Sequence, residues 1–408
     1  MELKNFTGLA NTVAAEAIPE GGLVEALNVD IDDAGRIRRR RGTQSIHAGR
    51  FHSLFQTSDN AVFVVRDGMF SKLNARMDTA PLLSVGDEKL HYVQVGDRVY
   101  AKSTTQAFSF DSSGSVLPWG IPHVPAFAVQ SAPGAIFAGD CGVVATYVRT
   151  ADGQEGGASE VRYVSTAGGI LVSGIPDLEG HTANVYLSAG DNVSYLAATR
   201  VAGSTMLTSP VQRLGVPLRT FGMYPPVGRG PLAKSFGRVY IADGHVLWAT
   251  EPHQFEWVDR AAGYKVMESR ITFLASVAAG VFVGTESGVY FMAGPFDAAR
   301  LSPVSNQGAP EQTPQEIDLA YVLKGDQQGV GVLFMTDGGI CVGLANGQVI
   351  NLTNKQFEFP KASEVSVLYR KQDGLNQFVG VSSHPGTPTG SARFGDFVDA
   401  EIIRHKGA

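Results

Sequence analysis

The stretch GVFVGTESGVYFMAG, residues 280–294, consists of two apolar segments joined by a short polar turn that ends at Gly288. A tight hairpin turn needs residues that accept a positive φ angle, and glycine does so without steric cost. Both segments are apolar almost throughout, without the alternation of a strand that has one face in water. The stretch therefore predicts a β-hairpin whose strands are covered on both faces.

The same pattern of apolar strand, polar turn with glycine and second apolar strand returns along the chain. It is found in AVFVVRDGMFSKL (61–73), YVQVGDRVYAKS (92–103), GRVYIADGHVLWAT (237–250) and GVLFMTDGGICVGL (331–344). The turn glycines Gly244, Gly288 and Gly339 are 44 and 51 residues apart, which is close to the length of one four-stranded propeller blade. The repeat favours a β-propeller, with a two-sheet sandwich of the same hairpins as the alternative.

Composition agrees with an all-β fold. The chain has 408 residues, of which 44% are hydrophobic and 18% charged, so it can bury a large core. Its 48 glycines and 20 prolines are spread along the chain and predict short strands joined by turns. A net charge of -6 excludes a protein whose whole surface binds nucleic acid, because phosphate binding depends on an excess of Lys and Arg.

The two cysteines, Cys141 and Cys341, are far apart and lie in apolar runs. This spacing indicates neither a disulfide framework nor a zinc cluster, and we expect two buried thiols. We expect no cofactor and no metal. The first residues lack a secretory signal pattern, and no window holds eighteen apolar residues, so we expect a soluble chain without membrane insertion.

Between residues 122 and 216 the rhythm changes to short strands at the spacing of a β-sandwich. The segment TYVRTADGQEGGAS (146–159) is similar to the hairpin of a fibronectin-like or immunoglobulin-like module. Proline-rich segments, HVPAF (123–127) and MYPPVGRGP (223–231), mark its boundaries. The predicted domains are an N-terminal arm (1–45), the first part of the propeller (46–121), an inserted sandwich (122–216) and the second part of the propeller (217–408).

Without the arm and the insert, roughly 270 residues remain, enough for about six blades. Two late strands are expected in NQFVGVSS (376–383) and FGDFVDAEII (394–403). Since a propeller usually closes by pairing a late strand with its first blade, we expect one of them to join the first sheet.

A basic run stands out in NVDIDDAGRIRRRRG (28–42). A calcium loop would need an acid at its fifth position and a glutamate at its twelfth, where this run has Ala34 and Arg41. If the run is extended, the arginines occupy both sides of a strand. On one side are Arg36, Arg38 and Arg40, and on the other are Arg39 and Arg41. Such a strand is expected at an exposed edge, where it contacts either a neighbouring subunit or DNA.

Motifs for phosphate loops, hydrolase elbows and zinc proteases are absent from the sequence. The most enzyme-like run is WATEPHQFEWVDRAAGY (248–264), where Glu251, Glu256 and Asp259 could act as acid and base on a glycosidic bond. Aromatic residues in such a run more often pack than bind, and carboxylates come this close by chance in a chain with 39 acidic residues. We therefore expect a protein that is not an enzyme and name no catalytic residue.

The segments NFTGLANT and AIPEGGLVEALNVDIDDAGRIRRRRGTQSI resemble the opening of structural virion proteins of tailed bacteriophages. The TYVRTADGQEGGASE segment and the ending SARFGDFVDAEII are similar to the same group. The resemblance implies an arm that leads into a β-propeller of the tail nozzle or hub, or of a head-to-tail protein that stabilises DNA. It also implies a chain made in the host cytoplasm and located in the virion tail.

From this resemblance we expect a homo-oligomeric ring that contacts other tail or connector proteins and forms part of the DNA conduit. An acidic lumen would let DNA slide, because carboxylates repel phosphates. Two alternatives stay open. A protein at the tail tip or on a fibre would use the inserted sandwich to bind a host receptor. A polysaccharide depolymerase would use the carboxylates of residues 248–264.

Overall fold

The computed structural model describes residues 6, 8–10, 12–24, 29–31, 35–39, 47–188, 193–209, 215–323, 328–353, 364–372, 375–383 and 400–403. The chain is all-β, as predicted. Within these residues, helix is limited to two short 3-10 turns, η1 (Ala15–Ala17) and η3 (Leu319–Tyr321). No helix of the described residues is long and apolar enough to cross a membrane.

The chain divides into two compact units, each built from segments that are distant in sequence. Unit 1 comprises Met1–Val93, Arg229–Leu247 and Val266–Ala408, and unit 2 comprises Gln94–Gly228 and Trp248–Lys265.

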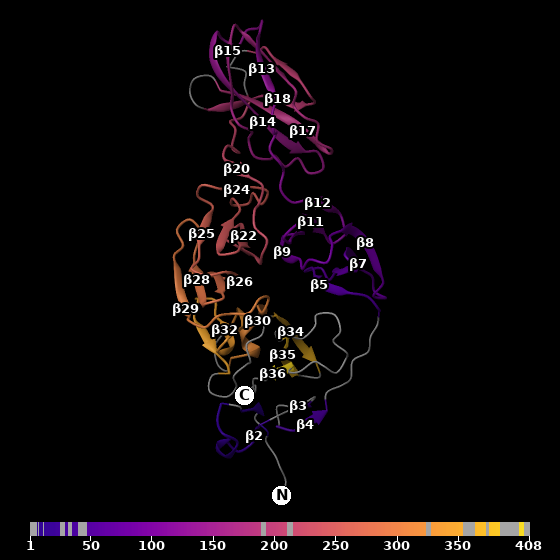
Figure 1. Cartoon of the computed structure of the whole chain (residues 1–408), viewed down its shortest axis with the longest axis vertical. Helices are drawn as coiled ribbons and strands as arrows, with labels where there is room; N and C mark the ends of the chain where they lie inside the picture. Colours follow the sequence, from indigo (N-terminus) through magenta and orange to yellow (C-terminus); the bar gives the residue numbers. More distant parts are fainter. Residues whose placement is uncertain are drawn as a thin grey trace. The chain divides into compact units, whose positions relative to one another are not determined.

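Five four-stranded antiparallel sheets are meanders, in which the strands lie side by side in chain order (Figure 1). The first contains β5 (Phe51–Gln56), β6 (Val62–Arg66), β7 (Met69–Leu73) and β8 (Thr79–Ser84). The second contains β9 (His91–Val95), β10 (Arg98–Lys102), β11 (Ala107–Asp111) and β12 (Val116–Pro118). The third contains β21 (Leu232–Ser235), β22 (Arg238–Asp243), β23 (Val246–Ala249) and β25 (Tyr264–Val266). The fourth contains β26 (Ile271–Val277), β27 (Gly280–Thr285), β28 (Val289–Ala293) and β29 (Leu301–Ser305). The fifth contains β30 (Gln315–Asp318), β31 (Val330–Thr336), β32 (Gly339–Gly343) and β33 (Val349–Asn351).

All five hairpins predicted from the glycine turns are present, as β6–β7, β9–β10, β22–β23, β27–β28 and β31–β32. The prediction that the hairpin at 280–294 is covered on both faces is confirmed for β27, in which every residue is buried, and in part for β28, where Tyr290 is half-buried and Ala293 is exposed. At its turn, the Thr285 side chain donates a hydrogen bond to the carbonyl oxygen of Gly288 at 2.8 Å. The hairpin is placed as predicted, but the expected reason for Gly288 is wrong, because it has no positive φ. A Cβ atom at Gly288 would come within 2.7 Å of the carbonyl oxygen of Ser305, so close packing explains the glycine.

The last sheet has three strands, β34 (Glu364–Gln372), β35 (Leu375–Ser383) and β36 (Ala400–Ile403). β36 pairs with β35, and the first sheet contains only β5–β8. The expectation that a late strand joins the first sheet is therefore wrong. The reason is that β35 pairs along its full length with β34 and still offers its other edge to β36.

Consecutive sheets of unit 1 pack face to face through aromatic side chains. The ring of Phe334 on β31 lies 5.2 Å from that of Phe273 and 5.9 Å from that of Phe282, both on the preceding sheet. A Cβ atom on Gly343 would come within 2.6 Å of the Phe282 ring. Glycine at this position lets the two sheets approach closely enough to exclude water.

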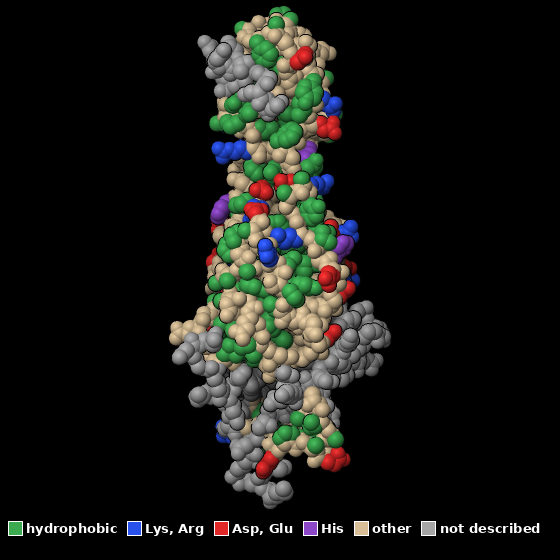
Figure 2. All heavy atoms as spheres, turned by 90° about the vertical axis from the view of Figure 1, so that its left-hand side faces the viewer, with side chains coloured by type: hydrophobic (Ala, Val, Ile, Leu, Met, Phe, Trp, Pro, Cys, Tyr) green, Lys and Arg blue, Asp and Glu red, His purple; other side chains and the backbone are tan. Residues whose placement is uncertain are grey.

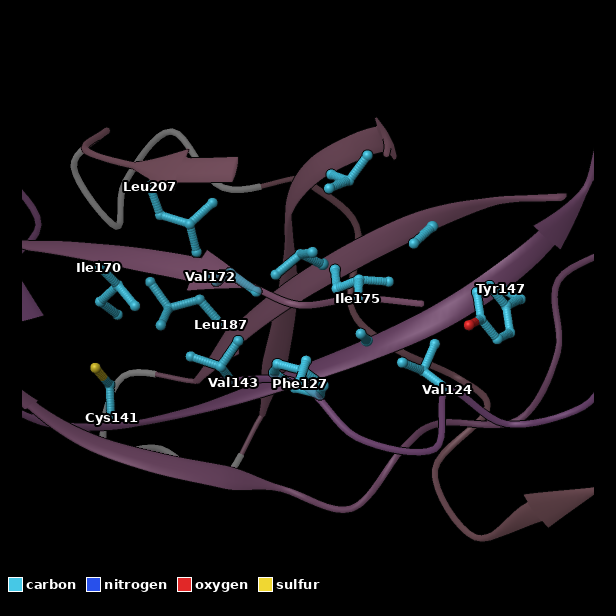
Figure 3. Packing of buried hydrophobic residues seen from close by; sticks show 14 of the residues in the cluster. Val124, Phe127, Cys141, Val143, Tyr147, Ile170, Val172, Ile175, Leu187 and Leu207 are labelled. Carbon is cyan, nitrogen blue, oxygen red and sulfur yellow. The ribbon is translucent and has the colours of Figure 1, made fainter. Parts of the chain in front are cut away.

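Unit 2 contains two sheets that enclose a common apolar core (Figure 3). One sheet contains β13 (Ala128–Ala132), β16 (Gly169–Ser173) and β19 (Thr205–Leu207). The other contains β15 (Arg162–Thr166), β14 (Gly139–Arg149), β17 (His181–Ser188) and β18 (Ser194–Val201). We call residues 122–216 the two-sheet module. Its core includes Val143, Ile170, Val172, Val185 and Leu187, all fully buried. Alternate residues of β14 and β17 point into this core, because successive side chains of a strand face opposite sides.

Four short strands lie near the N-terminus. β1 (Gly8–Leu9) pairs in parallel with β2 (Gly22–Leu23), and β3 (Val29–Ile31) pairs antiparallel with β4 (Ile37–Arg39). In unit 2, β20 (Met223–Tyr224) pairs with β24 (Val258–Asp259). β20 precedes residues 229–247 in the sequence, and β24 follows them. Their pairing brings the two sequence segments of unit 2 together at the base of the two-sheet module.

Candidate functional site

Part of the arginine run, Ile37–Arg39, forms strand β4 of a short hairpin. In β3 and β4 the register places Asp30 opposite Arg38 and Val29 opposite Arg39. The side chains of Arg36 and Arg39 are exposed. Phe6 donates its backbone N–H to the carbonyl oxygen of Gly35 at 3.0 Å, which ties the hairpin turn to the start of the chain. Two exposed arginines thus lie on this hairpin, Arg39 on β4 and Arg36 just before it.

The structure describes less of the other three arginines of the run. Arg38 belongs to β4 through its backbone pairing, and Arg40 and Arg41 lie outside the described residues. The face of the molecule drawn in Figure 2 shows basic and acidic side chains interspersed, with no gathering of one sign. On that face nothing extends a basic surface of the kind that a DNA duplex requires.

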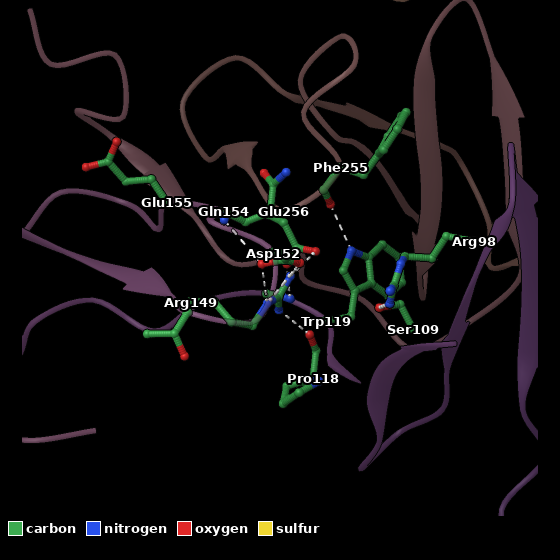
Figure 4. Close-up of polar contacts among 12 residues, drawn as sticks. Arg98, Ser109, Pro118, Trp119, Arg149, Asp152, Gln154, Glu155, Phe255 and Glu256 are labelled. Carbon is green, nitrogen blue, oxygen red and sulfur yellow. Dashed lines mark hydrogen bonds and ion pairs between the residues drawn. The ribbon is translucent and has the colours of Figure 1, made fainter. Parts of the chain in front are cut away.

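A buried ion cluster lies at the base of the two-sheet module, where the sequence analysis named no site (Figure 4). The guanidinium of Arg149, at the end of β14, donates to Asp152 Oδ2 at 2.7 Å and to Glu256 Oε1 at 3.0 Å. It also donates to the carbonyl oxygen of Pro118 at 2.5 Å. The second carboxylate oxygen of Glu256 accepts the backbone N–H of Gly120 at 2.6 Å.

Burial makes these contacts obligatory. The side chains of Arg149 and Glu256 are 4% and 6% exposed, respectively. Burial raises the pKa of Glu256, and the Arg149 guanidinium offsets part of that rise. Burial also opposes ionisation of Asp152, but the hydrogen bonds from Arg149 and from the backbone N–H of Gln154, together with the nearby guanidinium charges, outweigh burial and lower the pKa of that carboxyl. Removing one partner would leave a buried charge without compensation, which costs far more than losing an exposed pair.

Two indole groups and a lysine connect the same segments. Trp119 Nε1 donates to the carbonyl oxygen of Phe255 at 2.8 Å, and Trp257 Nε1 donates to that of Glu155 at 2.5 Å. Lys102 is buried, with its Nζ 3.0 Å from the carbonyl oxygen of Pro226 and over the Trp119 ring. Within unit 2, the loop of residues 251–259 is therefore joined to the module base by side chains from several segments.

The carboxylate of Glu155 joins the hairpin loop of the module to its outer sheet face. Its Oε1 atom accepts hydrogen bonds from Thr146 Oγ1 at 2.5 Å, Tyr186 OH at 2.7 Å and Asn184 Nδ2 at 3.3 Å. Burial, followed by this carboxylate, raises the pKa of Tyr186. The Tyr186 hydroxyl therefore stays a neutral donor, which is the form that the carboxylate needs.

The glycines of this loop permit close packing. A Cβ atom on Gly157 would stand 1.9 Å from the carbonyl oxygen of Met223 and 2.3 Å from Nε2 of His123. The His123 ring itself makes a hydrogen bond to that Met223 oxygen at 2.7 Å. The sequence showed a glycine-rich turn but gave no sign of this tertiary contact.

The three carboxylates considered for glycosidic chemistry occupy different surroundings. Glu256 belongs to the buried ion cluster. Asp259 accepts the backbone N–H groups of Ala261 and Ala262 at 2.7 and 3.2 Å, as a turn cap. Glu251 forms an isolated β-bridge with Gln254. The contacts of Glu256 and Asp259 hold the chain in place, and these two groups take structural roles in the loop.

Both cysteines are buried and free, as predicted. Burial raises the pKa of Cys341 to about 11 and also raises the pKa of Cys141. Among the described residues, no group of three or more His, Cys, Asp or Glu side chains is placed to hold a metal ion.

Comparison with known proteins found no matching family model and no matching curated protein. One similar solved structure is BBS1N in complex with ARL6DN, with 10% identity and a TM-score of 0.33 over 82% of this chain and 89% of that chain. Another is Hsv2 of Kluyveromyces lactis, with 8% identity and a TM-score of 0.31 over 82% of this chain and 90% of that chain. A third is apo AztD of Citrobacter koseri, with 12% identity and a TM-score of 0.27 over 75% and 88%. The first two are β-propeller proteins. At these TM-scores the likeness to the solved structures assigns no function to this chain.

Proposed function

We propose that this chain is a non-enzymatic structural protein of a bacteriophage tail, a six-bladed β-propeller that carries an inserted immunoglobulin-like or fibronectin-like sandwich. Copies of the chain assemble into a ring in the nozzle, hub or head-to-tail connector and form part of the DNA conduit. The five four-stranded meanders, the three-stranded sheet β34–β36 and the aromatic packing between two consecutive sheets of unit 1 support the propeller. The sequence resemblance to tail proteins supports the location.

The observation that carries this proposal is the buried Arg149–Glu256 ion pair with its attached Asp152. Glu256, one of the three carboxylates considered for glycosidic chemistry, instead joins the module base to a distant loop. Several further hydrogen bonds, including that of Trp119, cross the same junction. A junction built from many buried contacts transmits force without yielding, as a structural part of a tail must.

The arginine hairpin would serve assembly in this proposal. The exposed Arg39 lies on β4, and the exposed Arg36 lies just before that strand, in a hairpin that contains Asp30. A short exposed strand with charges on both sides suits contact with acidic groups of a neighbouring protomer. Contact with packaged DNA is the second role open to this strand.

A receptor-binding role is favoured by one specific observation. The two-sheet module exposes large apolar side chains, including Tyr163, Met206 and Val216, which are 78%, 50% and 64% exposed. Exposed aromatic and apolar groups on a rigid module are typical of protein interaction sites. The partner would be a host surface protein if this module points outward from the tail.

Cryo-electron microscopy of virions that contain the chain would test the proposal. We expect a closed ring of protomers on the tail axis. In each protomer, the contacts at the base of the two-sheet module should hold the module in one fixed position within unit 2. Density for copies at the tail periphery, with the modules directed outward, would replace the conduit role by receptor binding. Sugar release that is lost in a Glu251→Gln variant of unchanged stability would contradict both structural roles.

A further inference from the structure

Unit 1 contains a cavity of about 930 Å³. Its wall is built mainly from the first strands of five sheets, β5, β21, β26, β30 and β34, together with the start of β9. This volume lies in the range of protein pockets that enclose drug-sized molecules. Because the wall comes from strands of separate sheets, the cavity is a property of the assembled unit and not of one loop.

The chemistry of the wall is uncharged. None of the described residues that line the cavity is Lys, Arg, Asp or Glu. Burial lowers the pKa of His91 to about 4, and burial likewise lowers the pKa of His52, so both rings are neutral near pH 7. Phosphates and other ions would lose their hydration here without gaining a counter-charge. A neutral ligand suits this wall, and a nucleic acid does not.

Aromatic rings supply one side of the cavity. Phe55 and Tyr92 lie with ring centroids 4.9 Å apart, and Phe51 and Phe273 also line the wall. An aromatic ring of a ligand could pack against such side chains in offset or edge-to-face contacts, which aromatic pairs prefer.

The backbone is strained at three points around the cavity. Ser53, Met77 and Gln312 all line it, and they have φ angles of +53°, +66° and +58°. Residues other than glycine rarely adopt this conformation, and such strain gathers at ligand-binding sites. Strain at three separate segments of the wall indicates that the fold maintains the shape of the cavity at a cost in conformational free energy.

The strain at Ser53 has an identifiable structural cause. Ser53 and Leu54 form a bulge in β5, between the paired residues His52 and Phe55. The Ser53 side chain accepts the backbone N–H of Leu90 at 2.8 Å, and the Ser53 carbonyl accepts the Tyr92 hydroxyl at 2.9 Å. Bulges redirect side chains at sites of function. Here the bulge leaves Leu54 lining the cavity with 68% of its surface exposed.

One polar atom of the wall lacks a partner. His52 Nδ1 is 2.9 Å from Ser53 Oγ, whereas its Nε2 has no hydrogen-bond partner among the described residues. A buried ring nitrogen without a partner costs free energy that a ligand can recover. Nε2 is itself buried, so a ligand would reach it through a turn of the His52 ring, and His52 is the lining group that would then orient the molecule in the cavity.

We propose that this cavity binds one small, electrically neutral molecule that has an aromatic ring system and a hydrogen-bonding group opposite His52. The aromatic rings contact its faces, and His52 sets its orientation. This site is independent of the proposed role in the tail, because it lies within unit 1 of a single chain.

The test uses the purified full chain with Nile red, a neutral heteroaromatic dye, and with the anionic dye ANS, followed by fluorescence titration. We expect saturable binding of one Nile red per chain and no saturable binding of ANS. The variant Ser366→Phe fills the cavity from an exposed lining position on β34 and should raise the Kd for Nile red at least tenfold. The variant His52→Phe keeps a ring but removes the nitrogen, and should raise the Kd about fivefold.

The matched control is Leu368→Phe, on the same strand, since Leu368 is exposed and does not line the cavity. It should leave the Kd unchanged. Absence of saturable Nile red binding, or equal weakening by Ser366→Phe and Leu368→Phe, would overturn the proposal. The outcome does not depend on the role in the tail, because no virion is present in the experiment.

Discussion

The guanidinium of Arg149 and the carboxylate of Glu256, 107 residues apart in the sequence, form a buried ion pair at 3.0 Å. Neither segment could adopt its position without the other, because each would otherwise leave an ionised group away from water. The ion pair therefore joins the loop of residues 251–259 to the two-sheet module within unit 2.

Replacing Glu256 by Gln should destabilise unit 2 by about 2–3 kcal/mol, because Arg149 loses one of its two carboxylates while still buried. Urea unfolding followed by tryptophan fluorescence measures this directly, since Trp119 and Trp257 hydrogen-bond at the junction. The control is Glu160→Gln.

Glu160 is 87% exposed and stands 3.9 Å from Arg162, so its replacement should change stability by less than about 0.5 kcal/mol. Equal effects of the Glu256 and Glu160 variants would mean that the buried pair contributes nothing beyond a surface contact.

A methyl group at position 157 should disrupt the module base. Gly157→Ala would force the new Cβ against the carbonyl oxygen of Met223, and we expect a loss of about 3 kcal/mol. Gly153 has a φ of +72° but open space around its Cβ position, so Gly153→Ala should cost only about 1 kcal/mol. Thermal unfolding of both variants measures the difference, and a larger loss in the Gly153 variant would contradict the close contact at Gly157.

The sequence was sufficient for features that depend on neighbouring residues. The turn at Gly288 and the apolar segments beside it predict a hairpin locally, and the apolar runs around Cys141 and Cys341 predict buried thiols. The partner of Arg149 was not predictable, because its charge is compensated by a residue of another segment that only the folded chain brings near.

Sheet pairing between distant strands was also beyond the sequence. The apolar pattern of β36 predicts a strand but not its neighbour, since β35 and a strand of the first sheet offer similar edges. The bulge at Ser53 gave no signal either, because the residues around it read as an ordinary strand. These features depend on competition between tertiary contacts, which a single sequence does not rank.

Unit 1 should lose stability in mild acid through His91. Its pKa in the folded chain is lowered from 6.5 to about 4 by burial, with Lys89 adding to the effect. Because the unfolded chain binds the proton more readily, this contribution is complete above pH 6.5 and is lost as the pH falls toward 4, by up to about 3 kcal/mol.

Urea unfolding of the wild type and of His91→Gln at pH 7 and pH 4 measures this contribution of His91 to the free energy of unfolding. We expect the wild type to lose about 3 kcal/mol more than the variant over that interval. His245→Gln is the control, because His245 is exposed, and it should follow the wild type. If wild type and His91→Gln lose stability in parallel, proton uptake by His91 is not the cause.

Neither thiol should react in the native state. Burial holds the pKa of Cys341 at about 11 and raises that of Cys141, so the thiolate that attacks a disulfide reagent is scarce and covered. Titration with a chromogenic disulfide should show fewer than one reactive thiol per native chain and two in urea. Rapid reaction of one thiol in the native chain would mean that its sheet opens.

Reversing the charge of the arginine hairpin should separate its two roles. In the double variant Arg36→Glu and Arg39→Glu, contact with acidic groups of a neighbouring protomer turns into repulsion, and we expect the ring's dissociation constant to rise about tenfold or more. The double variant Arg76→Glu and Arg200→Glu carries the same charge change at exposed positions elsewhere and should assemble normally. Mass photometry over a protein concentration series measures ring formation. Normal assembly of the hairpin variant, together with weaker DNA binding and a shallower salt dependence, would assign the strand to DNA instead.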